Sequence, residues 1–82
     1  MSNAARVEIE ARLFVFTILG EMRQEGRLER AAANLQGLVA DLLRMYPLER
    51  WHEQGLITEE QLVMWIAQAL TLLLPGEDCS TA

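Results

Sequence analysis

The chain has 82 residues, a formal net charge of −5 and a hydrophobic content of 51 %. This length fits one domain, and the apolar content excludes a disordered chain. Cys79 and His52 are the only cysteine and histidine, which excludes an internal disulfide and a closed structural zinc site. All seven basic residues are arginine, so neither a Schiff-base lysine nor a P-loop lysine is present.

The first predicted element is a helix over residues 5–24 that ends at Gly26. Residues 6–13 alternate between polar and apolar, and residues 14–19 are rich in β-formers, so a strand over 6–19 is the alternative. We favour the helix because a lone strand would find no partner elsewhere in the chain. The helix would have a broad apolar face made of Val7, Ala11, Phe14, Val15, Ile18, Leu19 and Met22. A second, narrower apolar stripe would contain Ile9, Leu13, Phe16 and Gly20.

The second predicted element is one amphipathic helix over residues 28–46. Its apolar side would comprise Leu28, Ala31, Ala32, Leu35, Leu38, Val39, Leu42, Leu43 and Tyr46. Pro47 would end it and start a connector helix over residues 48–54. Gly55 is expected to adopt a left-handed conformation at the end of that connector.

The third main helix is predicted over residues 59–74. Thr58 and Gln61 have the spacing of a capping box, and Ile57 and Leu62 have that of a hydrophobic staple. Apolar residues cover most of this helix, so it must be buried from several sides. Residues 1–4 resemble a tag-derived or disordered N-terminus, and residues 75–82 are predicted to be a flexible acidic tail. The domain would therefore span residues 5–74.

The segment of residues 55–62 reads Gly-Leu-Ile-Thr-Glu-Glu-Gln-Leu. It resembles the core of the short C-terminal helical-hairpin modules called SHOCT domains, a resemblance that implies a role in oligomerisation. The resemblance covers eight residues. We carry no functional residue across from it.

The residues that carry enzyme chemistry do not form a catalytic combination. His52 has no nucleophile predicted nearby, and the acidic residues around it have ordinary roles on helices. We therefore predict no enzyme activity, no cofactor and no metal. Residues 48–70 resemble a helix-turn-helix, but the second helix opens with Glu59 and Glu60, so nucleic acid is not expected as a partner.

The sequence thus predicts an all-α fold: a small antiparallel helical bundle of three main helices plus a short connector helix, forming a homodimer. A chain this short has a marginal core, and its first and third main helices carry more apolar surface than one copy can bury. Both features favour association. The expected function is a protein–protein interaction module that acts as a regulator, inhibitor or adaptor. The alternatives are an acidic nucleic-acid mimic and an apolar ligand-binding bundle with Trp51, Trp65, Phe14 and Phe16 around its pocket. The interface candidates are Ile9, Leu13, Phe16, Gly20, Val63, Ile66 and Leu70.

The expected setting is the cytoplasm of a bacterial cell or a phage-infected one. No stretch reaches the ~18 apolar residues of a transmembrane helix, and no secretion signal opens the chain. The expected partners are therefore a second copy and another protein, and not a membrane.

Overall fold

The computed structural model describes residues 3–74, and this part of the chain contains helices and no strand. The helices are α1 (Asn3–Gln24), α2 (Leu28–Ala32), α3 (Leu35–Leu42), α4 (Leu48–Glu53) and α5 (Glu59–Leu73). The all-α prediction is confirmed, and the strand alternative for residues 6–19 is wrong. α1 starts two residues earlier than predicted because Ala4 and Ala5 are strong helix formers. The predicted tail at residues 75–82 lies outside the described residues.

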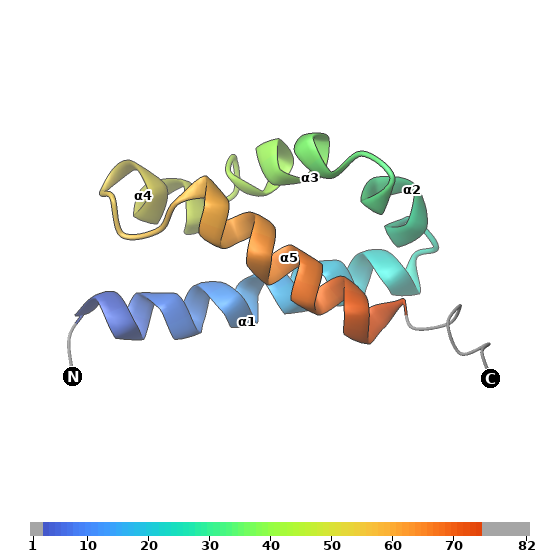
Figure 1. The fold of residues 1–82 in the computed structure, drawn as a ribbon, viewed down its shortest axis with the longest axis horizontal. Helices are drawn as coiled ribbons and strands as arrows, with labels where there is room; N and C mark the ends of the chain where they lie inside the picture. Colours follow the sequence, from blue (N-terminus) through green and yellow to red (C-terminus); the bar gives the residue numbers. More distant parts are fainter. Residues whose placement is uncertain (1–2, 75–82) are drawn as a thin grey trace.

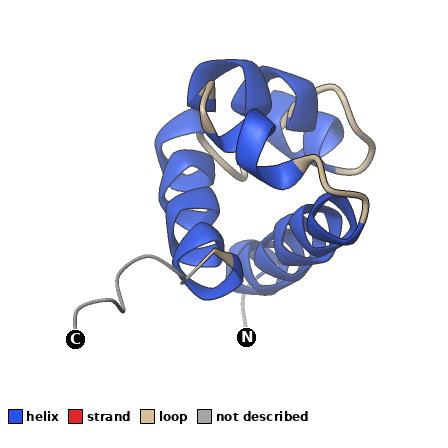
Figure 2. Cartoon of the chain, turned by 90° about the vertical axis from the view of Figure 1, so that its right-hand side faces the viewer, coloured by secondary structure: helices blue, strands red, loops and turns tan. Residues whose placement is uncertain are grey.

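The path of the chain is two long legs joined by an arch. The chain runs along α1, returns through α2, α3 and α4, and comes back across α1 as α5 (Figure 1). α1 and α5 pack against each other, and in the end-on view they form two legs below the arch (Figure 2). The first and last helices therefore share one face that the arch does not cover.

Each reversal of direction is made by a glycine in the left-handed region, with φ of 77° at Gly26 and 76° at Gly55. The Gly55 N–H donates to the His52 carbonyl at 3.1 Å, and the Leu56 N–H donates to the Trp51 carbonyl at 2.9 Å. Gly26 ends α1 with the same pair of bonds. These two bonds satisfy carbonyls that a helix end leaves free. The predicted conformation of Gly55 is confirmed.

The predicted single helix over residues 28–46 is wrong, because the chain leaves the helical path around Asn34. The Asn34 side chain accepts a hydrogen bond from the Gly37 N–H at 3.1 Å and thereby caps a new helix, α3. A Cβ on Gly37 would lie 2.6 Å from the Asn34 Nδ2 atom, so glycine leaves room for this cap. α3 ends at Leu42, and Tyr46 is 71 % exposed instead of lying on the apolar face.

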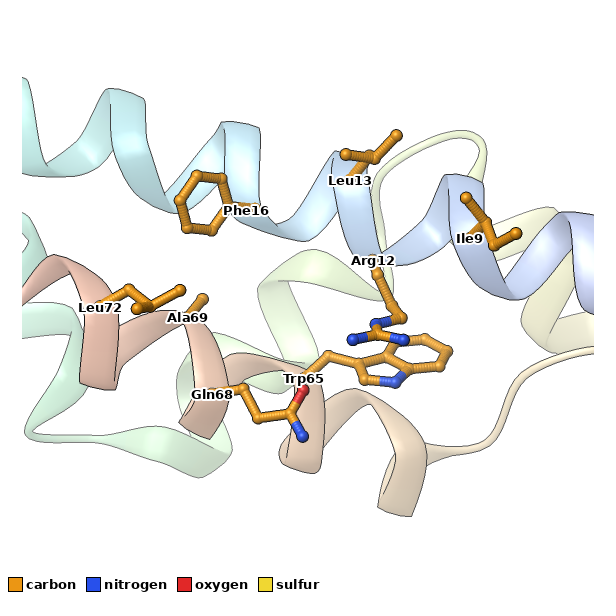
Figure 3. Close-up of a pocket in the computed structure, with 8 residues that line it drawn as sticks. All are labelled: Ile9, Arg12, Leu13, Phe16, Trp65, Gln68, Ala69 and Leu72. Atoms are coloured by element: carbon orange, nitrogen blue, oxygen red, sulfur yellow. The ribbon is translucent and has the colours of Figure 1, made fainter.

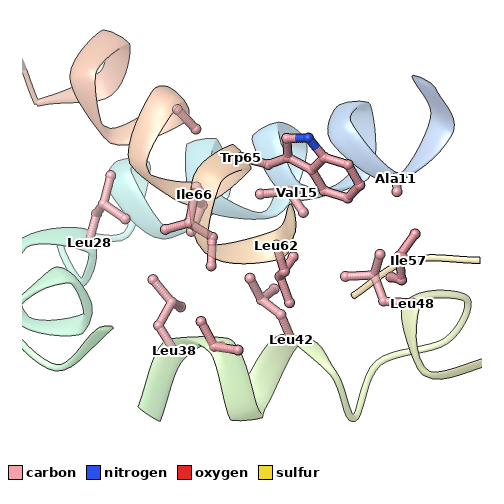
Figure 4. Packing of buried hydrophobic residues seen from close by; sticks show 13 residues of the cluster. Ala11, Val15, Leu28, Leu38, Leu42, Leu48, Ile57, Leu62, Trp65 and Ile66 are labelled. Carbon is pink, nitrogen blue, oxygen red and sulfur yellow. The ribbon is translucent and has the colours of Figure 1, made fainter. Parts of the chain in front are cut away.

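The interior between the legs and the arch is wholly apolar. No polar or charged side chain is buried among the described residues. The buried set shown in Figure 4 is Ala11, Val15, Leu19, Leu28, Leu38, Val39, Leu42, Leu48, Ile57, Leu62, Trp65, Ile66 and Ala69. The broad face predicted for α1 is confirmed, since its members are either buried or packed against this core. Burial of each large side chain stabilises the fold by about 1.5–3 kcal/mol.

The start of α5 confirms the predicted capping box and gives a local test of it. The Thr58 hydroxyl accepts from the Gln61 N–H at 3.1 Å, and the Gln61 side chain accepts from the Thr58 N–H at 2.9 Å. We expect Thr58→Ala to lower the free energy of unfolding by about 1 kcal/mol in a denaturant titration, because a helix-end donor loses its partner.

Thr71→Ala is the matched control for this substitution. Thr71 is exposed near the other end of α5, and its hydroxyl donates to the Ala67 carbonyl within the same helix. Alanine has the higher helix propensity, so this variant should be at least as stable as the wild type. Equal losses in the two variants would contradict the cap assignment.

Candidate interaction surface

The uncovered face of α1 and α5 contains a groove of about 280 Å³ (Figure 3). One wall is the narrow stripe predicted on α1, and its large side chains are exposed: Ile9 by 53 %, Leu13 by 62 % and Phe16 by 42 %. The opposite wall comes from α5. The residues that line the groove are Ile9, Arg12, Leu13, Phe16, Trp65, Gln68, Ala69 and Leu72.

The spacing of apolar residues along both helices produces this groove. In α1, steps of four and three residues place Ile9, Leu13 and Phe16 on one line, while the buried face points toward the core. In α5, Trp65 and Ala69 are buried against α1, and Leu72 follows one turn later with 69 % exposure. The groove floor is therefore core, and its rims are apolar side chains that no described residue covers.

The groove carries little charge. Arg12 is the one charged residue in its lining, and it has no ion-pair partner among residues 3–74. On α1 the described ion pair is Arg6 with Glu10, at 3.5 Å. In Figure 3 the Arg12 side chain extends from α1 toward the side of the groove where Trp65 lies on α5. The sequence from Gln61 to Leu74 contains no charged residue.

The other predicted interface residues lie in different environments. Gly20 is half-buried at the end of the stripe, and Leu70 is half-buried against the core. Val63 lies outside the groove, in a second hollow between α3 and α5. Ile66 was predicted as an interface residue, but its side chain is fully buried in the core of this chain, because the arch packs over that side of α5.

Sequence reasoning missed Arg12 and Leu72 as parts of this surface. Leu72 stood in an α5 segment that is apolar on most sides, and only packing decides which side stays uncovered. The sequence predicts no interface role for Arg12. The signal that could have identified it was its place beside Leu13 and one turn from Ile9, both members of the predicted stripe.

The four aromatic residues predicted around one pocket are divided between two hollows. Phe16 and Trp65 line the groove. Phe14 and Trp51 line a separate hollow between α1 and α4, together with Pro47. Leu13 borders both, so the exposed apolar surface continues around α1.

The described residues that could take part in metal binding or catalysis are not grouped into a site. His52 and Glu53 lie on α4, and residues 3–74 contain no group of three or more acidic, histidine or cysteine side chains placed to hold an ion. Cys79 lies outside the described residues. None of the helices described is both long and apolar enough to cross a membrane.

Comparison of the chain with protein-family models, with curated proteins and with solved structures finds no match.

Proposed function

We propose that this protein is a protein–protein interaction module, acting as a regulator, inhibitor or adaptor, and that the α1–α5 groove is its binding surface. The proposal includes self-association into a homodimer, in which the two copies together form an antiparallel helical bundle. We place this association in the cytoplasm. The observation that carries the proposal is the row of exposed apolar side chains along the groove, Ile9, Leu13 and Phe16, on a helix whose other apolar face is buried in the core or packed against it.

The size of the exposed surface supports this function. A fully exposed large apolar side chain presents roughly 200 Å². The three stripe residues and Leu72 therefore expose on the order of 400–500 Å² in one place. The largest apolar patch on a typical monomeric protein is about 300–600 Å² and is often functional. Such a patch favours association because contact with another chain removes it from water.

The low charge of the groove favours an apolar partner surface over charge-based recognition. Protein interfaces are depleted of charged residues at their centre and enriched in aromatic residues and arginine. The groove has this composition, with Trp65, Phe16 and Arg12 among its lining residues. The acidic residues in the described part of the chain lie outside its lining.

Site-specific photo-cross-linking in cells that naturally contain the protein tests this function. A benzophenone amino acid at Leu13 or Phe16 should give protein adducts, because these side chains would contact the bound chain. The same probe at Arg30 on α2, or at Glu49 on α4, should give none, because both positions are exposed away from the groove. Equal labelling at all four positions, or no adduct at the groove positions, would refute the proposed function.

A further inference from the structure

Resting on this proposed function, we infer that the groove of each molecule receives α1 of a second copy, with the two α1 helices antiparallel across a two-fold axis. In this register Ile9 lies level with Gly20 of the second copy, and Leu13 lies level with Phe16 of the second copy. Each copy thus supplies the stripe that fills the other's groove. The inference rests on the spacing of the stripe, the charges at its ends and the area that it exposes.

The spacing of the stripe is the same when it is read in either direction. The four positions are separated by steps of four, three and four residues, so an antiparallel copy of α1 meets the first with the same pattern. Large residues then face smaller ones, since Ile9 packs against Gly20 of the second copy at both ends. A Cβ at Gly20 would meet no atom within 4 Å in a single copy, so this position is open to a neighbour.

Arginines at both ends of the stripe fix the register. Arg6 and Arg23 occupy the next positions of the same helical pattern, one before Ile9 and one after Gly20. Sliding the copies by one heptad would place Arg6 against Phe16, or Arg23 against Leu13, and would desolvate a guanidinium in the apolar contact. In the proposed register Arg6 lies level with Arg23 of the second copy beyond each end of the stripe, where both arginines are exposed and water screens their charges. One antiparallel register therefore pairs all four stripe residues with stripe residues.

A parallel pair would also match apolar residues but would pack less evenly. It would place Gly20 against Gly20 and leave a void at that level, whereas the antiparallel pair distributes side-chain volume along the whole contact. The antiparallel pair also aligns opposite helix dipoles.

The charges of the two faces permit this contact. Each chain has a net charge of −5, so two copies repel each other least when they meet at a surface that lacks acidic side chains. The lining of the groove contains no acidic side chain. Arg12 borders the groove on the α5 side of the stripe, so its guanidinium lies at the edge of the contact and not at its centre.

The area is sufficient for a specific dimer. The apolar side chains of two grooves together remove roughly 900 Å² from water. The polar side chains of Arg12 and Gln68, which also line the groove, bring the total toward the ~1,200 Å² at the lower end of specific interfaces. We therefore expect a dimer that dissociates on dilution.

Cross-linking between two single-cysteine chains tests the register. In a Cys79→Ser background, Ile9→Cys and Gly20→Cys chains are prepared separately, mixed and joined with a short thiol cross-linker. The mixed product should exceed each self-product several-fold, because like positions are about 16 Å apart along the axis in the antiparallel pair. Arg30→Cys chains, on exposed α2, control for random collisions. Sedimentation of the wild type at high micromolar concentration should give twice its mass of 9.3 kDa.

The outcomes separate this inference from the proposed function. Self-products of Ile9→Cys and Gly20→Cys in excess of the mixed product would show a parallel pair and overturn the register. A wild type that sediments as a monomer would overturn the second copy as occupant, and with it the homodimer in the proposed function. Groove adducts to another protein in cells would still support the interaction module itself. If a cysteine variant is not folded by circular dichroism, Arg23→Cys replaces Gly20→Cys, with Arg6→Cys as its mixed partner, because these two exposed positions are also level in the antiparallel pair.

Discussion

Leu62→Ala is expected to lower the free energy of unfolding by about 3 kcal/mol, within the range of about 2–5 kcal/mol measured for large-to-small core substitutions. Leu62 is fully buried on α5 and lies next to Leu42 of α3 (Figure 4). Its truncation would leave a cavity in the packed core that the surrounding side chains could fill only in part. Since small domains are stable by only about 5–15 kcal/mol, this loss should be plain in a denaturant titration.

Leu72→Ala is the matched control, since it makes the same chemical change on the same helix. Leu72 is 69 % exposed on the groove rim, so its truncation should cost less than about 1 kcal/mol in a folded single copy. It should instead weaken association, measured by sedimentation over a dilution series. Equal losses of stability in the two variants would show that α5 is rotated from the position described.

The two faces of α1 should respond in opposite ways to a charge. Val15→Glu should unfold the chain, because Val15 is fully buried and no polar side chain is buried among the described residues to pair with the carboxylate. Leu13→Glu should keep the helical circular dichroism spectrum and the unfolding midpoint of a diluted wild type, because its side chain already faces solvent.

Association gives the complementary measurement for this pair. Leu13→Glu should sediment as a monomer and lose photo-adducts at Phe16, because a carboxylate in the centre of an apolar contact would be desolvated without a partner. Glu21→Gln, an exposed change on the same helix, should alter neither property. A Leu13→Glu chain that still associates as the wild type does would exclude the groove as the binding surface.

The helices with strong local signals could be predicted from the sequence. The glycine at residue 55 and the pair Thr58 and Gln61 set the start of α5 through bonds among near neighbours, so pattern and structure agree. The two apolar faces of α1 could also be predicted, because charged residues separate them on a helical wheel.

The break at Asn34 and the orientation of α5 could not be predicted in the same way. The periodicity from Leu28 to Leu42 continues across the break, and the competing signal is one asparagine side chain that caps α3. On α5 nearly every side is apolar, so the assignment of Ile66 to the core and Leu72 to the surface depends on where α1 and the arch pack. Local patterns do not contain that information.

The broken arch has a consequence for the order in which the molecule folds. α2 and α3 contain five and eight residues, too few to be helical in water without support. α1, with 22 residues, can form transient helix earlier. The arch must therefore acquire its helices only as it docks on the two legs. Its amide protons should exchange with solvent through partial opening while those in the middle of α1 and α5 remain protected. The α1–α5 groove is lined by the two legs alone, so we expect opening of the arch to leave its walls in place.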